Sequence, residues 1–152
     1  MYVVVVFVTM FAAPLLSIAL DFWSGSGPII ALVGKWFVFW TVGVRLGLAG
    51  VRQIAQPGFT AKDIFKIADE KAWAIVRELG FANLALAIVG LASLAKPTFV
   101  LPAAIVGAIF YGAAGAQHLL ARGRTTNETI AMASDLFAFI MLALFVAGAP
   151  PA

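Results

Sequence analysis

Long apolar runs separated by short polar stretches make up most of this chain. Five runs come close to the 20 or so residues that a helix needs to cross a bilayer. They cover residues 2–20, 29–50, 74–95, 99–121 and 129–147. No Lys or Arg precedes the first run, which favours a transmembrane helix, kinked at Pro14, over a signal peptide. The pattern predicts a single all-α domain over residues 1–152, an integral membrane bundle in which an N-terminal helix joins a four-helix core.

Residues 51–73 form the only long polar stretch. Within it, apolar side chains recur at helical spacing opposite charged ones, which is typical of an amphipathic helix lying on a membrane surface. We therefore expect an interfacial helix over about residues 60–72. Thr60 would cap its start, with Asp63 at the capping-box position. This helix can run directly into the third apolar run.

The composition agrees with a membrane protein. Hydrophobic residues make up 63% of the chain and charged residues only 11%, against about 25% charged residues in soluble domains. The absence of cysteine excludes thiolate metal sites and cysteine nucleophiles. The net charge of +3 does not point to nucleic acid, because no interleaving of basic and aromatic residues accompanies it.

The basic residues predict how the bundle is oriented. With five spans, Lys35 and Lys96 fall on one side of the membrane. The other basic residues fall on or near the opposite side: Arg45, Arg52, Lys62, Lys66, Lys71, Arg77, Arg122 and Arg124. Basic residues are enriched on the cytoplasmic side of membrane proteins. We therefore expect a cytoplasmic N-terminus and a periplasmic or extracellular C-terminus in a bacterial inner membrane.

Four predicted helices place polar residues in the cytoplasmic half of the bundle, at a rise of ~1.5 Å per residue. These residues are Arg45, Glu78, Asn83, Tyr111, Gln117, His118 and Asp135. Ionisable groups inside a membrane are costly, so they are usually paired or functional. We expect the seven side chains to line one pocket that opens to the cytoplasm. In this arrangement Glu78 points inward, with Arg45 as its partner, and Arg77 points outward.

Several of these residues also have a purely structural interpretation. Glu78 and Arg45 can simply tie two helices together, and His118 can cap the C-terminal end of its helix. Asp135 is too deep and too short to reach the membrane surface, so it must be paired, protonated or facing a watery cavity. Lys35 is expected to extend toward the outer headgroups. A single histidine gives little support for a metal, and we expect no metal site.

Small residues recur at four-residue spacing on two predicted helices. Gly43 and Gly47 form one such pair, and Ala104, Ala108 and Gly112 form a ridge on the fourth run. Small residues at this spacing let helices approach closely. The contacts can lie within the chain or between copies in a homo-oligomer.

The segment from Glu78 to Ala85, ELGFANLA, resembles a family of small bacterial membrane proteins known only as a domain of unknown function. In those proteins an E-x-GFANLA segment is followed by a helix that ends in His and a final helix that contains Asp. The corresponding segment here runs from Gly112 to His118 and is followed by Asn127 and Asp135. The resemblance covers about residues 36–146 and leaves the first helix outside as an addition. More loosely, the core is similar to the DoxX-like membrane proteins, some of which are associated with quinone-linked redox chemistry. This resemblance implies the fold and a quinone as one candidate ligand, but no established activity.

Three functions remain open. The first is binding of a lipid-soluble or amphipathic small molecule in the polar pocket of the inner leaflet. The second is an accessory subunit of a membrane complex, in which the buried charges only hold helices together. The third, proton-coupled transport, needs polar groups across the whole bilayer, and the outer half offers little beyond Lys35. An enzyme is the least supported class, because the sequence contains no nucleotide-binding loop, no haem ligand pair and no convincing Ser-His-Asp arrangement. No particular cofactor is indicated.

Overall fold

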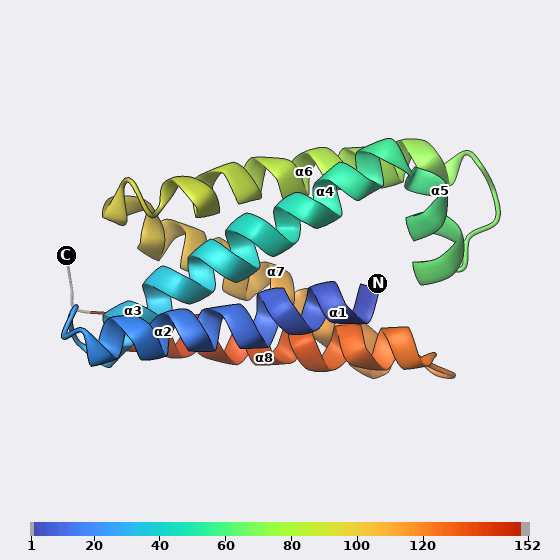
Figure 1. The fold of residues 1–152 in the computed structure, drawn as a ribbon. Coiled ribbons are helices and arrows are strands. Elements are labelled where there is room, and N and C mark those ends of the chain that lie inside the picture. Colours follow the sequence, from blue (N-terminus) through green and yellow to red (C-terminus); the bar gives the residue numbers. More distant parts are fainter. Residues whose placement is uncertain (1, 150–152) are drawn as a thin grey trace.

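The computed structural model describes residues 2–149, and this part of the chain is helical without any strand. As predicted, five helices are long and apolar enough to cross a membrane, and they lie lengthwise in one bundle (Figure 1). Three of them are built from shorter segments, because π-helical or 3-10 turns interrupt or precede the α-helix. The segments are α1 (Tyr2–Phe7), η1 (Val8–Ala12) and α2 (Ala13–Trp23); α3 (Ile29–Phe37), η2 (Val38–Arg45) and α4 (Leu46–Ala55); α6 (Ala72–Ala92); η4 (Pro97–Phe99) and α7 (Val100–Leu120); and α8 (Thr126–Gly148).

Glycines bring the second and third long helices into close contact. A Cβ atom on Gly90 of α6 would lie 2.5 Å from the backbone nitrogen of Gly43 in η2. One on Gly50 of α4 would lie 2.8 Å from the carbonyl oxygen of Gly80. Only glycine permits backbones to approach this closely. The predicted close contact at Gly43 and Gly47 is therefore made within the chain, against α6.

The second small-residue ridge is also covered within the chain. Ala104 and Ala108 are buried, and a Cβ on Gly112 would lie 2.9 Å from the ring of Phe139 in α8. The helices α7 and α8 pack along each other over much of their length. A homo-oligomer that used either ridge would therefore have to separate neighbouring helices of one chain.

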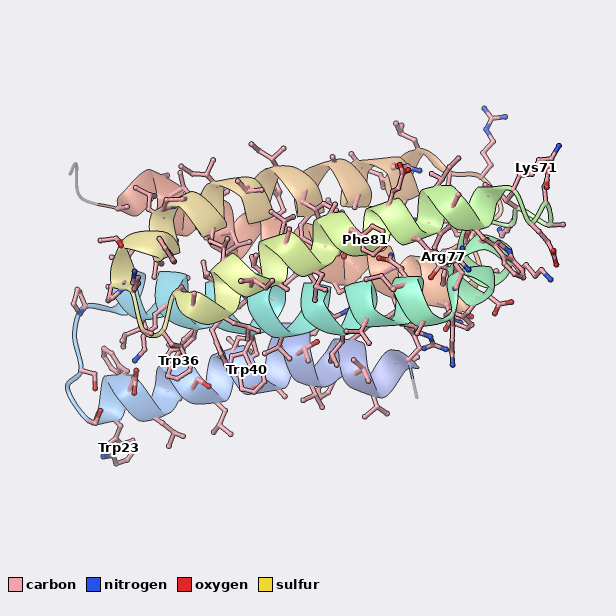
Figure 2. The ribbon with its side chains drawn as sticks, turned by 90° about the horizontal axis from the view of Figure 1, so that it is seen from above. Trp23, Trp36, Trp40, Lys71, Arg77 and Phe81 are labelled. Carbon is pink, nitrogen blue, oxygen red and sulfur yellow. The ribbon has the colours of Figure 1, made fainter. Side chains whose placement is uncertain are left out.

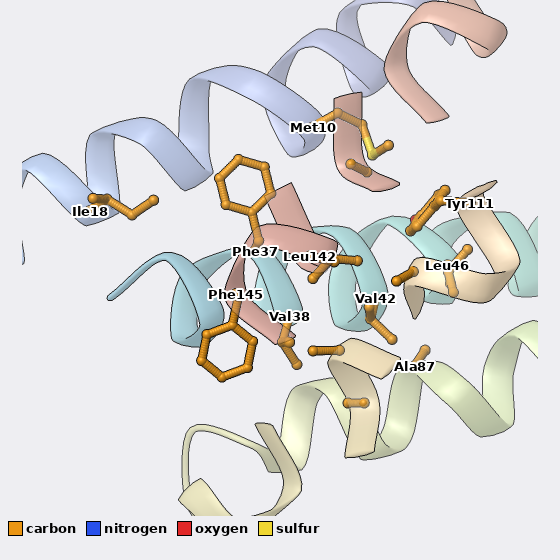
Figure 3. Close-up of a cluster of buried hydrophobic side chains, with 14 of the residues drawn as sticks. Met10, Ile18, Phe37, Val38, Val42, Leu46, Ala87, Tyr111, Leu142 and Phe145 are labelled. Atoms are coloured by element: carbon orange, nitrogen blue, oxygen red, sulfur yellow. The ribbon is translucent and has the colours of Figure 1, made fainter. Parts of the chain in front are cut away.

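An apolar core fills the middle of the bundle (Figure 3). Phe37, Val38, Val42 and Leu142 are each at most 1% exposed. The ring of Phe145 packs against Gly34, where even a methyl group would not fit. This core contains residues of all five long helices, so it holds fixed the elements that carry the polar residues.

Polar contacts attach the first helix to the second. The carboxylate of Asp21 accepts hydrogen bonds from Lys35 Nζ at 2.7 Å and from Trp36 Nε1 at 2.9 Å. One turn further on, Trp40 Nε1 donates to Ser17 Oγ at 3.0 Å, and Figure 2 shows both tryptophans over the first helix. Lys35 is thus held by an ion pair with Asp21, near the C-terminal end of the first helix. Its extension toward the outer headgroups stays a prediction.

The predicted interfacial helix over 60–72 is wrong in extent. The chain instead forms a short hook of α5 (Pro57–Phe59) and η3 (Thr60–Ile64), followed by residues without helical structure up to α6. The backbone of Gln56 is not helical, as is usual for a residue before proline, so the hook begins at Pro57. Thr60 therefore lies inside the hook and does not cap it. The hook buries Thr60 and Ala61, and these tertiary contacts override the helical periodicity of the sequence.

Candidate functional site

A cavity of about 870 Å³ lies at the end of the bundle that carries the hook. In Figure 1 the start of α1, the hook and the start of α8 are all found at this end. Here α4, which packs along α6, and α8, which packs along α7, form opposite walls. Residues of the hook and of the segment after it, among them Phe59, Thr60 and Ile67, complete the lining. The cavity is thus built from all five long helices and the hook.

Six of the seven predicted site residues lie around this cavity: Arg45, Asn83, Tyr111, Gln117, His118 and Asp135. They come from four long helices, the same four that were predicted to carry them. The structure therefore brings them together, although their depths alone could not say which way each side chain would point.

Glu78 is the exception, and the expectation that it points inward to Arg45 is wrong. It is exposed on α6, does not line the cavity and forms no salt bridge among the described residues. Glu78 precedes Asn83 by five residues, which places it about 140° around the helix. Because Asn83 faces the cavity, Glu78 faces away from it. Arg77 is exposed, as expected (Figure 2).

Two hydrogen bonds organise the inner wall. Tyr111, only 2% exposed, donates its hydroxyl to the carbonyl oxygen of Thr41 at 2.6 Å. Asn83 donates from Nδ2 to Gln53 Oε1 at 2.8 Å. The Oδ1 atom of Asn83 is buried and has no hydrogen-bond partner among residues 2–149. Buried polar atoms almost always have one, so this oxygen is an unsatisfied acceptor in the inner wall.

Opposite charges face the cavity without pairing. Arg45 and Asp135 both line it, yet the salt bridges of residues 2–149 are Lys35 with Asp21 and Lys66 with Glu128. Arg45 instead lies over the ring of Tyr2, with its guanidinium carbon 5.8 Å from the ring centre. The guanidinium and the carboxylate are therefore both available to groups inside the cavity.

Arg52 and Gln53 belong to the site but were absent from the residues predicted for it. The guanidinium of Arg52 stacks on Phe59 of the hook, 3.6 Å from the ring centre, and its Nε is buried without an acceptor from residues 2–149. The spacing of seven residues from Arg45 was the signal for Arg52, because residues two turns apart share a helix face. Gln53 gave no such signal, since its role depends on the rotation of α6.

At the mouth of the cavity, beside the hook, Glu128 links two parts of the chain by hydrogen bonds. Its Oε2 accepts hydrogen bonds from Lys66 Nζ at 3.1 Å, from the Thr125 backbone nitrogen at 2.6 Å and from the Thr125 hydroxyl at 2.9 Å. The Thr125 hydroxyl in turn accepts from the Glu128 backbone nitrogen, which completes a capping box at the start of α8. The segment after the hook is thereby anchored to α8.

His118 lies at the mouth as well, but it does not cap its helix. Arg124 takes that role, because its Nη1 donates to the carbonyl oxygens of His118, Leu119 and Ala121 at 2.9, 2.7 and 3.0 Å. The His118 side chain is left free to line the cavity. Among residues 2–149 no three His, Asp or Glu side chains gather in a way that could hold a metal ion.

Comparison with known proteins shows the family. The chain belongs to a family of unknown function (DUF6790), whose model matches residues 1–149. The match includes the first helix, so the expectation that this helix is an addition outside the family is wrong. No curated protein and no solved structure matches the chain. Any inference about activity therefore depends on the site itself.

Proposed function

We propose that this protein is a multi-pass protein of the bacterial inner membrane that binds a lipid-soluble or amphipathic small molecule in the cavity. The observation that carries the proposal is the cavity itself. Its volume of about 870 Å³ lies within the range of roughly 300–1,000 Å³ found for small-molecule sites. Such sites combine apolar walls with a few convergent polar groups, and the lining here has this composition.

The distribution of apolar surface and charge supports the membrane location. The five long helices expose many large apolar side chains, among them Phe7, Ile75 and Ile109, each at least 60% exposed. Such surface is costly in water and favourable in lipid. The stretch from the hook to α6 and the polar turn before α8 lie at one end (Figure 1) and carry five of the ten basic residues: Lys62, Lys66, Lys71, Arg122 and Arg124. By the positive-inside rule this end is cytoplasmic, with the C-terminus of α8 on the other side.

The ligand would lie with its polar group against the inner wall. Arg45 can donate hydrogen bonds, whereas Asp135 and the free Oδ1 of Asn83 can accept them. Apolar side chains such as Leu46 and Phe110 would contact the rest of the molecule. A quinone, suggested by the resemblance to DoxX-like proteins, has oxygens that suit Arg45 and is one candidate.

The packed core argues against a continuous transport path. A smaller cavity of about 330 Å³ lies near Lys35, toward the other end of the bundle. Along the second long helix, Phe37, Val38 and Val42 lie between the two cavities and are at most 1% exposed. A proton path would have to cross this apolar layer, where polar groups are expensive.

Cavity filling tests the proposal. Ala114 lines the cavity, three residues after Tyr111 and four before His118, so all three share one face of α7. We expect Ala114→Trp to remove lipid-soluble molecules that co-purify with the wild-type protein in neutral detergent, as measured by solvent extraction and mass spectrometry. Ala116→Trp is the matched control, because Ala116 is exposed on the same helix and does not line the cavity.

The control variant should retain the molecules. If wild type and Ala114→Trp yield the same extract, and neither is stabilised against heat by a panel of amphiphiles and quinones, the cavity is not a binding site. An accessory role within a larger membrane complex would then be the better interpretation.

A further inference from the structure

The charges on the cavity wall point to the kind of head group that the ligand carries. Arg45 and Arg52 both line the cavity from the second long helix. They are seven residues apart, about 10.5 Å along the helix axis at 1.5 Å per residue, and share a face. Neither forms a salt bridge with an acidic side chain in the described part of the chain. Two guanidinium groups therefore face one cavity without a protein counter-charge in contact.

Arg52 is held in a geometry suited to an anion. Stacking on Phe59, at 3.6 Å from the ring centre, restrains the plane of the guanidinium and leaves the N–H groups at its edge free to donate. Its Nε is buried and has no acceptor among the described residues. Buried donors are almost always satisfied, and the planar fork of arginine matches the paired oxygens of a carboxylate or phosphate.

The acidic residues of the wall do not balance these charges. Glu128 is already occupied by Lys66 and by the backbone and hydroxyl of Thr125. Asp135 is the remaining acidic residue of the lining, so one free carboxylate faces two arginines. Inside an apolar bundle solvent screens such an excess of positive charge only weakly, which favours an anion in the cavity.

We infer that the ligand is an anionic amphiphile, whose carboxylate or phosphate head binds at Arg52 and Arg45 while its apolar tail follows the wall past Phe110. This inference rests on the proposed function and narrows it to ligands with an anionic head group, which a neutral quinone lacks. Arg52 lies beside the hook and Arg45 lies two turns deeper along the same wall, so the head sits between the mouth and the inner wall.

Four probes separate the contributions of head and tail: hexadecanoate, hexadecyl phosphate, hexadecanol and inorganic phosphate. Binding is measured by calorimetry on the full chain in neutral detergent. Charge-assisted hydrogen bonds contribute about 1.5–3 kcal/mol, so we expect at least one of the two anionic amphiphiles to bind roughly 10- to 100-fold more tightly than hexadecanol. Inorganic phosphate alone should bind more weakly than hexadecyl phosphate.

Variants assign the effect to the arginines. Arg52→Gln should remove most of the preference for the anionic probes and leave hexadecanol binding unchanged. Arg77→Gln is the control for net charge, because Arg77 is exposed and outside the cavity, and it should keep the preference. If Arg52→Gln does not fold, Arg52→Lys retains the charge but not the planar fork, and it should weaken the preference.

Each alternative outcome has a definite meaning. Equal affinity for hexadecanol and both anionic amphiphiles in the wild-type protein would overturn the anionic head group but leave the proposed function standing. If inorganic phosphate bound as tightly as hexadecyl phosphate, the apolar tail would contribute nothing, and the inference that the ligand is an amphiphile would be overturned. An unchanged preference in Arg52→Gln would overturn the role of Arg52. Absence of binding by all three long-chain probes would count against the proposed function itself.

Discussion

Replacing Gly90 by alanine should separate the two helices that carry Arg45 and Asn83. The new Cβ atom would lie 2.5 Å from the backbone nitrogen of Gly43 and 2.8 Å from its Cα. Ordinary contacts between non-bonded heavy atoms occur at about 3.5–4.0 Å, so η2 and α6 would have to move apart by roughly 1 Å. The obstacle is backbone, which cannot rotate away as a side chain can.

The expected change in the free energy of unfolding is the difference between two effects. Overpacking in a tight core costs about 1–3 kcal/mol, and a rigid backbone obstacle puts this site at the upper end. Inside a helix, alanine stabilises the folded state by about 1 kcal/mol relative to glycine. We therefore expect Gly90→Ala to lower the free energy of unfolding by about 2 kcal/mol.

Gly47→Ala provides the comparison on the same interface. Its Cβ would lie 3.3 Å from the Cβ of Ala87, a tight contact that a small shift of the helix can relieve. Its effect should stay below about 1 kcal/mol in either direction. Both variants can be measured by SDS titration in mixed micelles, followed by circular dichroism. A Gly90→Ala protein as stable as wild type, or more stable than Gly47→Ala, would refute the close backbone contact.

Two further predictions concern charged residues. Glu128→Gln keeps an acceptor for the capping box but loses the charge that holds Lys66, so hydrogen exchange in the hook and in the segment after it should become several-fold faster while the start of α8 stays protected. Lys71→Gln, at an exposed lysine in the segment after the hook, is the control, and equal exchange in all three proteins would contradict the anchoring role. Glu78→Ala should change the free energy of unfolding by no more than about 0.5 kcal/mol, as is usual for exposed positions, and should leave amphiphile binding intact. A loss of several kcal/mol in the same SDS titration would instead support a buried pairing of Glu78 with Arg45.

The case of Glu78 and Asn83 shows which part of the site could be predicted. The sequence alone located the polar layer, because depth along a helix follows from residue number at ~1.5 Å per residue. Six of the seven residues chosen in this way line the cavity. Depth says nothing about rotation around the axis, however. The rotation of α6 is set by Gly80 and Gly90 against the second long helix, and it turns Glu78 outward.

The hook shows a second limit. Helical periodicity over residues 60–72 predicted a helix on the membrane surface, yet the chain forms one short turn and then leaves the helical conformation. Lys66 has a φ of 58°, which few residues other than glycine adopt. The segment instead gains the ion pair of Lys66 with Glu128. Glu128 lies far outside the segment, so no local pattern could reveal this pairing.

The sequence by itself therefore determined the five long apolar helices and the layer of polar residues near one end. These properties depend on the length of apolar runs and on position along them, which can be read in one dimension. Only the tertiary structure decided which polar side chains share a cavity, where the hook closes it, and that Arg52 and Gln53 belong to it. These features depend on how helices rotate and pack, and that is set by contacts between residues far apart in the chain.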